Sequence, residues 1–86
     1  MPTIDHIDAA RVVIYLNDHR PAHVHVVKGD GKAVFILHCP KGPPELREIT
    51  GFSRTEIRHI LEESISRLAL FCGERERYHG PDRQNS

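Results

Sequence analysis

Short apolar runs alternate with turn residues in the first half of the chain, and this pattern predicts β-strands. Residues 11–16 are rich in the β-branched and aromatic side chains that favour strands. Residues 22–28 and 32–39 form two further runs, separated by the turn-forming residues Gly29, Asp30 and Gly31. Residues 45–50 alternate enough to predict a fourth strand at a sheet edge. We therefore expect an antiparallel sheet of three or four strands.

An amphipathic helix is the clearest element of the second half. Ser53 is followed three residues later by Glu56, which predicts a capping box at the start of the helix. Apolar or small residues then recur every three or four positions, and Gly73 predicts the stop. The expected stripe comprises Ile57, Ile60, Leu61, Ser64, Ile65, Leu68 and Cys72. The pattern predicts an α+β fold in which one C-terminal amphipathic helix covers one face of the sheet, with a single domain over residues 1–73 and a polar tail over 74–86.

Length and charge narrow the classes of function. Eighty-six residues are too few for a self-contained Rossmann, barrel or kinase-like enzyme. Twelve basic and twelve acidic side chains cancel, so no overall positive charge drives non-specific binding to nucleic acid. No apolar run approaches the length of a membrane span, and residues 1–5 lack a signal-peptide pattern. Cys39 and Cys72 lie far apart without a CxxC motif, which is typical of a cytoplasmic protein with reduced, buried thiols.

Histidine is the residue type that points to chemistry, with seven in the chain. Side chains two apart on a strand share a face, so His23 and His25 should project together with Cβ atoms roughly 6.5–7 Å apart. The turn decides what lies opposite them. A two-residue turn at Asp30 and Gly31 would place His38 opposite His23. A three-residue turn beginning at Gly29 would place Leu37 there instead.

Three interpretations of this histidine cluster stay open. In a metal site, the ligands of a divalent ion such as zinc or nickel would come from His19, His23, His25 and His38. In RNA cleavage, His23 or His25 would be the catalytic general acid or base, and Arg20 and Lys28 would bind phosphate. In a structural role, the imidazoles would hydrogen-bond to loop carbonyls or to Asp18, which can also orient a neighbouring ring.

The same stretch resembles a known family. Asp18-His19-x-Pro21-x-His23-x-His25-Val26 is similar to the D-H-x-P-P-H-F-H-V signature of small bacterial proteins grouped as a domain of unknown function, number four-one-six-zero. The resemblance covers roughly residues 1–72 and includes the strand at 12–16 and the apolar-striped helix. Two positions depart from the signature: Ala22 stands where the family has a second Pro, and Val24 where it has Phe.

The resemblance implies a cytoplasmic bacterial protein that pairs with a small protein encoded by a neighbouring gene, in a toxin–antitoxin-like arrangement. We therefore expect partner binding through the open sheet face or an edge strand. RNA is a further candidate partner, cleaved by His23 or His25 if the protein is the toxin. The alternative is a divalent-metal-binding protein. Because an 86-residue core is small, self-association would also add stability.

Overall fold

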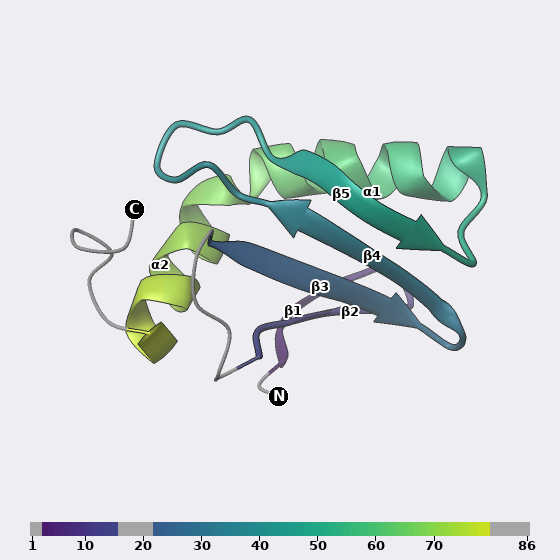
Figure 1. Cartoon of the computed structure of the whole chain (residues 1–86), viewed down its shortest axis with the longest axis horizontal. Helices are drawn as coiled ribbons and strands as arrows, with labels where there is room; N and C mark the ends of the chain where they lie inside the picture. The colour runs from purple at the N-terminus through teal and green to yellow at the C-terminus, as the bar shows by residue number, and fades with distance from the viewer. Residues whose placement is uncertain (1–2, 16–21, 80–86) are drawn as a thin grey trace.

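Five antiparallel strands and two helices make up the computed structural model, which describes residues 3–15 and 22–79 (Figure 1). The strands are β1 (Thr3–Ile7), β2 (Ala10–Val13), β3 (His23–Lys28), β4 (Gly31–Ile36) and β5 (Glu45–Thr50), and they lie in the sheet in that order. The helices α1 (Arg54–Ser66) and α2 (Leu68–His79) follow, and both pack against the same face of the sheet. The α+β class is confirmed. The prediction of three or four strands and one helix is wrong, because β1 and α2 were not anticipated.

β1 has a weak local pattern, which is why the sequence did not predict it. Ile7 is the buried residue of this strand, and Ile4 packs partly against the core. The strand pairs with β2 through a two-residue turn at Asp8 and Ala9, where Asp8 adopts a φ of 54°. Contacts with the rest of the sheet and with the helices therefore stabilise β1 more than its own propensity does.

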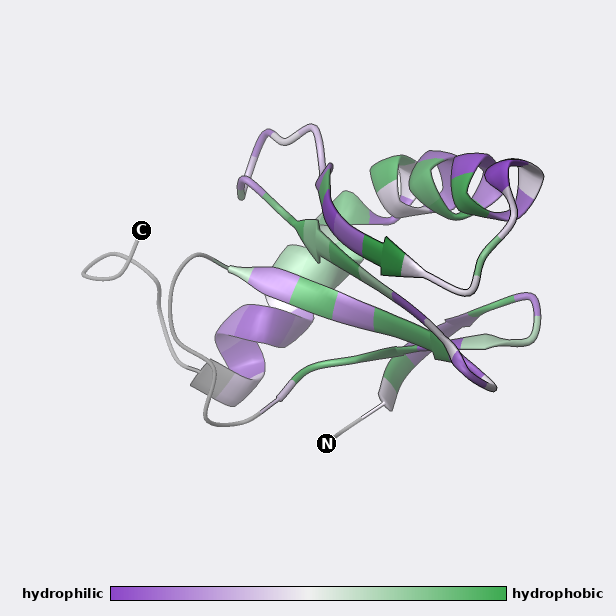
Figure 2. Ribbon diagram, turned by 45° about the vertical axis from the view of Figure 1, so that its right-hand side comes forward, coloured by the Kyte–Doolittle hydropathy of each residue, from purple (hydrophilic) through white to green (hydrophobic). Residues whose placement is uncertain are grey.

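The core lies between the sheet and the two helices. Alternate side chains of each strand point towards the helices, and Figure 2 shows the resulting alternation of polar and apolar residues along β3. Burying each large apolar side chain contributes about 1.5–3 kcal/mol. The buried cluster comprises Ile7, Ala10, Val12, Ile14, Val24, Val26, Ala33, Phe35, Leu37, Ile60, Leu68 and Phe71.

The predicted start of the first helix is confirmed. The Ser53 hydroxyl accepts a hydrogen bond from the Glu56 amide at 3.1 Å, and the Glu56 carboxylate accepts one from the Ser53 amide at 2.8 Å. These two bonds satisfy amide groups that have no partner within the helix. Neither of the two described helices is long and apolar enough to cross a membrane.

The prediction of a single helix that ends at Gly73 is wrong, because the helix breaks at Arg67. Arg67 has φ −109° and ψ 15°, so α1 ends there and α2 starts in a new direction. Ile65 is 51% exposed, and Phe71, outside the predicted stripe, is fully buried. The other residues of the predicted stripe are buried or partly buried, as expected: Ile57, Ile60, Leu61, Ser64, Leu68 and Cys72. Gly73 lies inside α2, and the helix continues to His79.

A disulfide joins Cys39, in the loop after β4, to Cys72 in α2. The expectation of two reduced, buried thiols is therefore wrong, and no free cysteine occurs in the described residues. Thirty-three positions separate the two cysteines along the chain, and their Cα atoms lie 5.9 Å apart. Packing of α2 on the sheet brings them together, which spacing alone could not show.

Candidate functional site

The sheet face opposite the helices carries both strand histidines. The rings of His25 and His23 lie 5.1 Å apart between centroids, so the predicted shared face is confirmed. Tyr15, which follows β2, places its ring 3.9 Å from that of His25 at an interplanar angle of 36°. His25 is 7% exposed and His23 is half-buried. We call Tyr15, His23 and His25 the ring cluster.

Apolar side chains surround the ring cluster, and charged ones lie further out. His25 pairs with Val13 on β2 and Val34 on β4, and both valines are buried. Next along the strands, Val27 pairs with Arg11 and Lys32, both exposed cations. On the β5 side the exposed carboxylates of Glu45 and Glu48 lie opposite Ile36 and Val34. We call this helix-free surface of β2 to β5 the open face.

The turn between β3 and β4 decides which residues meet on the open face. It consists of Gly29 and Asp30, with Lys28 paired to Gly31, so His23 lies opposite Ile36. Gly29 adopts φ 56°, a left-handed conformation that glycine accepts at the first position of a tight hairpin turn. Both registers expected from the sequence are therefore wrong: the one with His38 opposite His23 by two residues, and the one with Leu37 opposite His23 by one.

His38 takes no part in the ring cluster. It adopts φ 53° beyond the end of β4, and its Nε2 lies 2.7 Å from Oε1 of Glu45. Of the predicted metal ligands, the structure brings His23 and His25 together and places His38 against Glu45 instead. His19 lies outside the described residues, as do Asp18 and Arg20. Within residues 3–15 and 22–79, no three side chains of His, Cys, Asp or Glu form a group that could hold a metal ion.

Lys28 is directed to the other side of the sheet. Its Nζ lies 2.8 Å from Oε2 of Glu56 at the start of α1. The hydrogen bond from Lys28, together with that from the Ser53 amide, lowers the pKa of Glu56 to about 2. The same carboxylate raises the pKa of Lys28. The structure therefore does not bring this predicted phosphate-binding lysine near His23 and His25.

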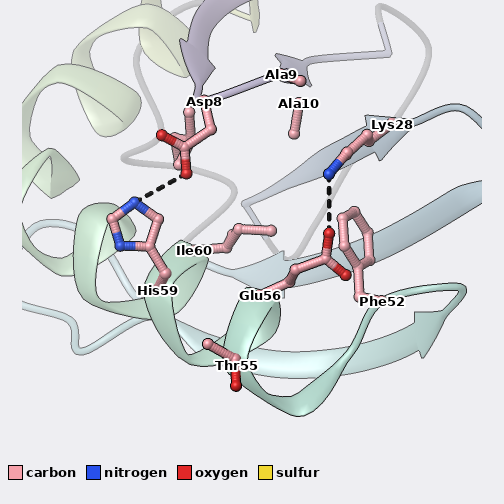
Figure 3. Close-up of a pocket in the computed structure, with 10 residues that line it drawn as sticks. Asp8, Ala9, Ala10, Lys28, Phe52, Thr55, Glu56, His59 and Ile60 are labelled. Carbon is pink, nitrogen blue, oxygen red and sulfur yellow. Dashed lines mark hydrogen bonds and ion pairs between the residues drawn. The ribbon is translucent and has the colours of Figure 1, made fainter.

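A pocket of about 490 Å³ lies between the β1–β2 turn and the start of α1 (Figure 3). Two ion pairs lie along it: Lys28 with Glu56, and Nε2 of His59 with Oδ2 of Asp8 at 3.0 Å. The volume falls in the range of small-ligand sites. The charges of Lys28 and Glu56 neutralise each other, and the Asp8 carboxylate lies against the His59 imidazole. Sequence reasoning missed it because Asp8 and His59 belong to no motif. The lining residues are Ile7, Asp8, Ala9, Ala10, Lys28, Phe52, Thr55, Glu56, His59 and Ile60.

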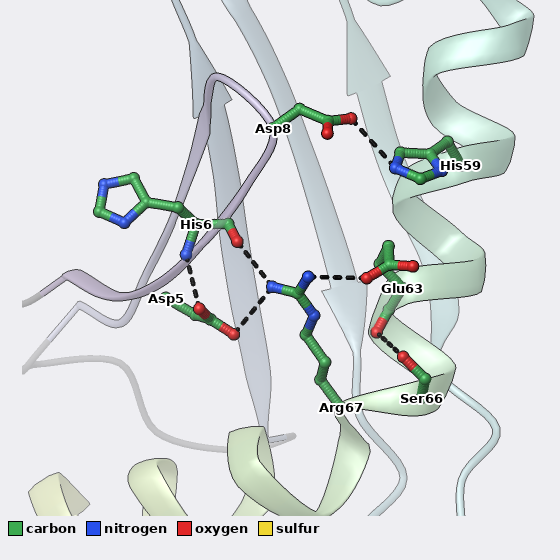
Figure 4. Close-up of polar contacts among 7 residues, drawn as sticks. All are labelled: Asp5, His6, Asp8, His59, Glu63, Ser66 and Arg67. Atoms are coloured by element: carbon green, nitrogen blue, oxygen red, sulfur yellow. Dashed lines mark hydrogen bonds and ion pairs between the residues drawn. The ribbon is translucent and has the colours of Figure 1, made fainter.

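Arg67 connects the helix break to β1 (Figure 4). Its Nη1 donates to Oδ2 of Asp5 at 3.1 Å and to the His6 carbonyl at 2.6 Å, and its Nη2 donates to Oε1 of Glu63 at 2.7 Å. The hydrogen bond to Glu63, followed by that to Asp5, raises the pKa of Arg67. The four-residue spacing of Glu63 and Arg67 was a visible signal of a helix pair. The contacts with β1, about sixty residues away in sequence, were not.

The structure defines a small α+β domain whose two described helices both lie on one side of the sheet. Residues 10–65 match the model of the family described as Domain of unknown function (DUF4160). The chain belongs to this family, and the resemblance seen in the sequence is confirmed. The match spans β2 to β5 and nearly all of α1, whereas β1, Arg67 and Cys72 lie outside it. No curated protein and no solved structure matches the chain.

Proposed function

We propose that this domain is one component of a two-protein, toxin–antitoxin-like pair and binds its small protein partner through the open face. The observation that carries the proposal is the make-up of that face. Its centre holds the ring cluster beside the apolar Val27 and Ile36, and neither helix covers it. A sheet with one face left to the surroundings has a ready surface for a second protein.

The distribution of residue types on the open face supports its use as a protein interface. Such interfaces have a core enriched in aromatic residues and depleted of charge, surrounded by a polar rim. Here the rings and valines are central, and the charged residues Arg11, Lys32 and Glu48 are peripheral. Because the rim carries both signs, it suits a protein with mixed charges better than a phosphate backbone, which requires an excess of cations.

The two other functions expected from the sequence receive less support. RNA cleavage requires an accessible general acid or base beside a cation. His25 is 7% exposed, and the ammonium group of Lys28 is bound to Glu56 on the other side of the sheet. Metal binding by four histidines requires His38, which contacts Glu45 instead. Both functions are nevertheless separate outcomes of the experiment below.

The test is calorimetric titration of the purified protein with the purified product of the neighbouring gene. We expect Lys32→Glu and His23→Ala each to weaken binding about tenfold, the effect of losing roughly 1.4 kcal/mol of interface energy. Glu62→Lys changes an exposed charge on α1 and is the matched control, with binding expected to stay within about twofold.

Two results would contradict this proposal. One is full affinity in both open-face variants. The other is cleavage of RNA by the wild type that His23→Ala abolishes while partner binding is unchanged, which would assign the histidine to RNA chemistry. Metal content is measured on the same samples, because a stoichiometric metal whose removal abolishes binding would move the function to the histidine-ligand alternative.

We also propose that the pair acts in the cytoplasm, on the gene context that the family resemblance implies. The test is fractionation of cells that produce the protein at its native level, and we expect to find it in the cytoplasmic fraction. Recovery from a periplasmic or secreted fraction, where a disulfide such as Cys39–Cys72 is stable, would contradict this location.

A further inference from the structure

The two edges of the sheet differ in whether side chains already form hydrogen bonds with the outward-facing main chain. At the β1 edge, the His6 amide donates to Oδ1 of Asp5 at 2.8 Å, and its carbonyl accepts from Arg67. The side chains of Asp5 and Arg67 thus form hydrogen bonds with the main-chain groups of His6 in the middle of this edge strand. β5 forms the other edge, and all six of its residues are exposed. Within the described residues, no strand pairs with its outer side.

A register irregularity gives β5 an unusual distribution of side chains. Leu46 lies opposite Phe35 and Ile49 lies opposite Ala33, so both apolar residues project to the helix side of the sheet. Arg47 is the additional residue between these pairs, and it lies next to Glu48 on the strand. Leu46 is 37% exposed and Ile49 39% exposed, which leaves an apolar pair at the open edge.

The sequence of β5 is complementary to itself when two copies run antiparallel. With the two-fold axis between Arg47 and Glu48, each arginine faces the glutamate of the other strand. Leu46 then faces Ile49 of the second copy, and Glu45 faces Thr50. No like charges are opposed, and apolar residues meet on the same side of the joined sheet. Opposite-charge and apolar cross-strand pairs each contribute roughly 0.2–1 kcal/mol in an antiparallel ladder.

We propose that β5 pairs with β5 of a second copy of this chain and forms a symmetric dimer with one continuous sheet. Charge complementarity supports a second copy as the occupant, because Arg47 and Glu48 have no ion-pair partner among the described residues and satisfy each other across the axis. Since the β1 edge is closed by Arg67, the pairing ends at two copies and does not propagate into a fibre. The dimer forms along the outer edge of β5, where the open face ends at Glu48, and its strand pairing does not require the proposed partner.

The test is sedimentation equilibrium of the full chain with charge variants of β5. The interface is small, so we expect the wild type to dimerise with a Kd of about 1–100 µM. Arg47→Glu places two glutamates opposite each other at both symmetric positions and should make the protein monomeric. Glu48→Arg does the same with arginines. Mixing these two variants restores both opposite-charge pairs, and we expect a heterodimer from two proteins that are each monomeric alone.

Glu62→Arg, an exposed charge reversal on α1, is the control and should dimerise like the wild type. Circular dichroism of every variant checks that the fold is kept. A wild type that stays monomeric at about 500 µM would overturn the proposal, since that concentration exceeds the expected Kd. Dimerisation of either single variant alone, or failure of the mixture to associate, would overturn it equally, because both results exclude this register.

Discussion

The disulfide between Cys39 and Cys72 is expected to supply a large part of the stability of this domain. It closes a loop over 33 positions. In the chain-entropy treatment a loop of that length destabilises the unfolded state by about 3.7 kcal/mol at 25 °C. An 86-residue domain has a total stability of only about 4–13 kcal/mol at 0.05–0.15 kcal/mol per residue. Loss of the bond should therefore lower the melting temperature by roughly 15–30 °C.

The effect should be strongest in α2. The disulfide connects this helix to the loop after β4. Few other residues of α2 are buried, namely Leu68, Phe71 and Arg75. Hydrogen exchange should therefore show the amides of residues 68–79 losing protection on reduction before those of β3 and β4.

The assay is urea unfolding of the wild type with and without a phosphine reductant. The reduced and oxidised proteins differ only in the bond and two hydrogens, so the comparison isolates the cross-link. Cys39→Ala combined with Cys72→Ala is the control, and its free energy of unfolding should not respond to the reductant. A change of less than about 1 kcal/mol on reduction of the wild type would refute the loop-entropy reasoning.

Three further predictions concern stability and its pH dependence. Ser64→Ala should raise the free energy of unfolding by about 1 kcal/mol in urea titrations, because its buried hydroxyl has no hydrogen-bond partner among the described residues; a loss would show that the hydroxyl is satisfied. Gly73→Ala should raise the free energy of unfolding by about 1 kcal/mol, because Gly73 lies on α2 with open space where the new Cβ would be. Gly51→Ala should lower it by more than about 1 kcal/mol, because Gly51 has φ 74° and the new Cβ would lie 2.7 Å from Cα of Gly31. Equal effects of the two substitutions would contradict this backbone argument. The pKa of Glu56 is about 2 in the folded protein against an ordinary 4.5, so its contribution to stability is present above pH 4.5 and is lost as the pH falls towards 2. Glu56→Gln keeps the capping contacts and should flatten that part of the stability profile, and a profile identical to the wild type would assign the acid response to other carboxylates.

Local patterns in the sequence were sufficient for several elements. Alternation of apolar residues marked β3, β4 and β5, because strand side chains repeat every two positions. Ser53 and Glu56 marked the start of α1 through contacts between residues three positions apart. The spacing of His23 and His25 placed them on one face for the same geometric reason. Each of these features depends on neighbours along the chain.

The register of the β3–β4 hairpin shows where local patterns stop being decisive. Gly29 and Gly31 can both adopt positive φ, so the sequence allowed several turns. The observed turn puts Val24 opposite Phe35 and Val26 opposite Ala33, so all four point into the core. A shift by one residue would expose one strand's apolar set, and burial in the assembled protein selects the register.

By itself, the sequence determined the α+β class, the family, the start of α1 and the shared face of the two strand histidines. The tertiary structure decided that Cys39 meets Cys72, that Arg67 closes the β1 edge and that His38 pairs with Glu45. It also decided that, within the described residues, no strand pairs with the outer side of β5 and both helices lie on one face of the sheet. The physical reason is the separation along the chain between the residues that interact. Periodicity and capping arise between residues a few positions apart, whereas cross-links, edge contacts and uncovered surfaces exist only after distant segments have packed together.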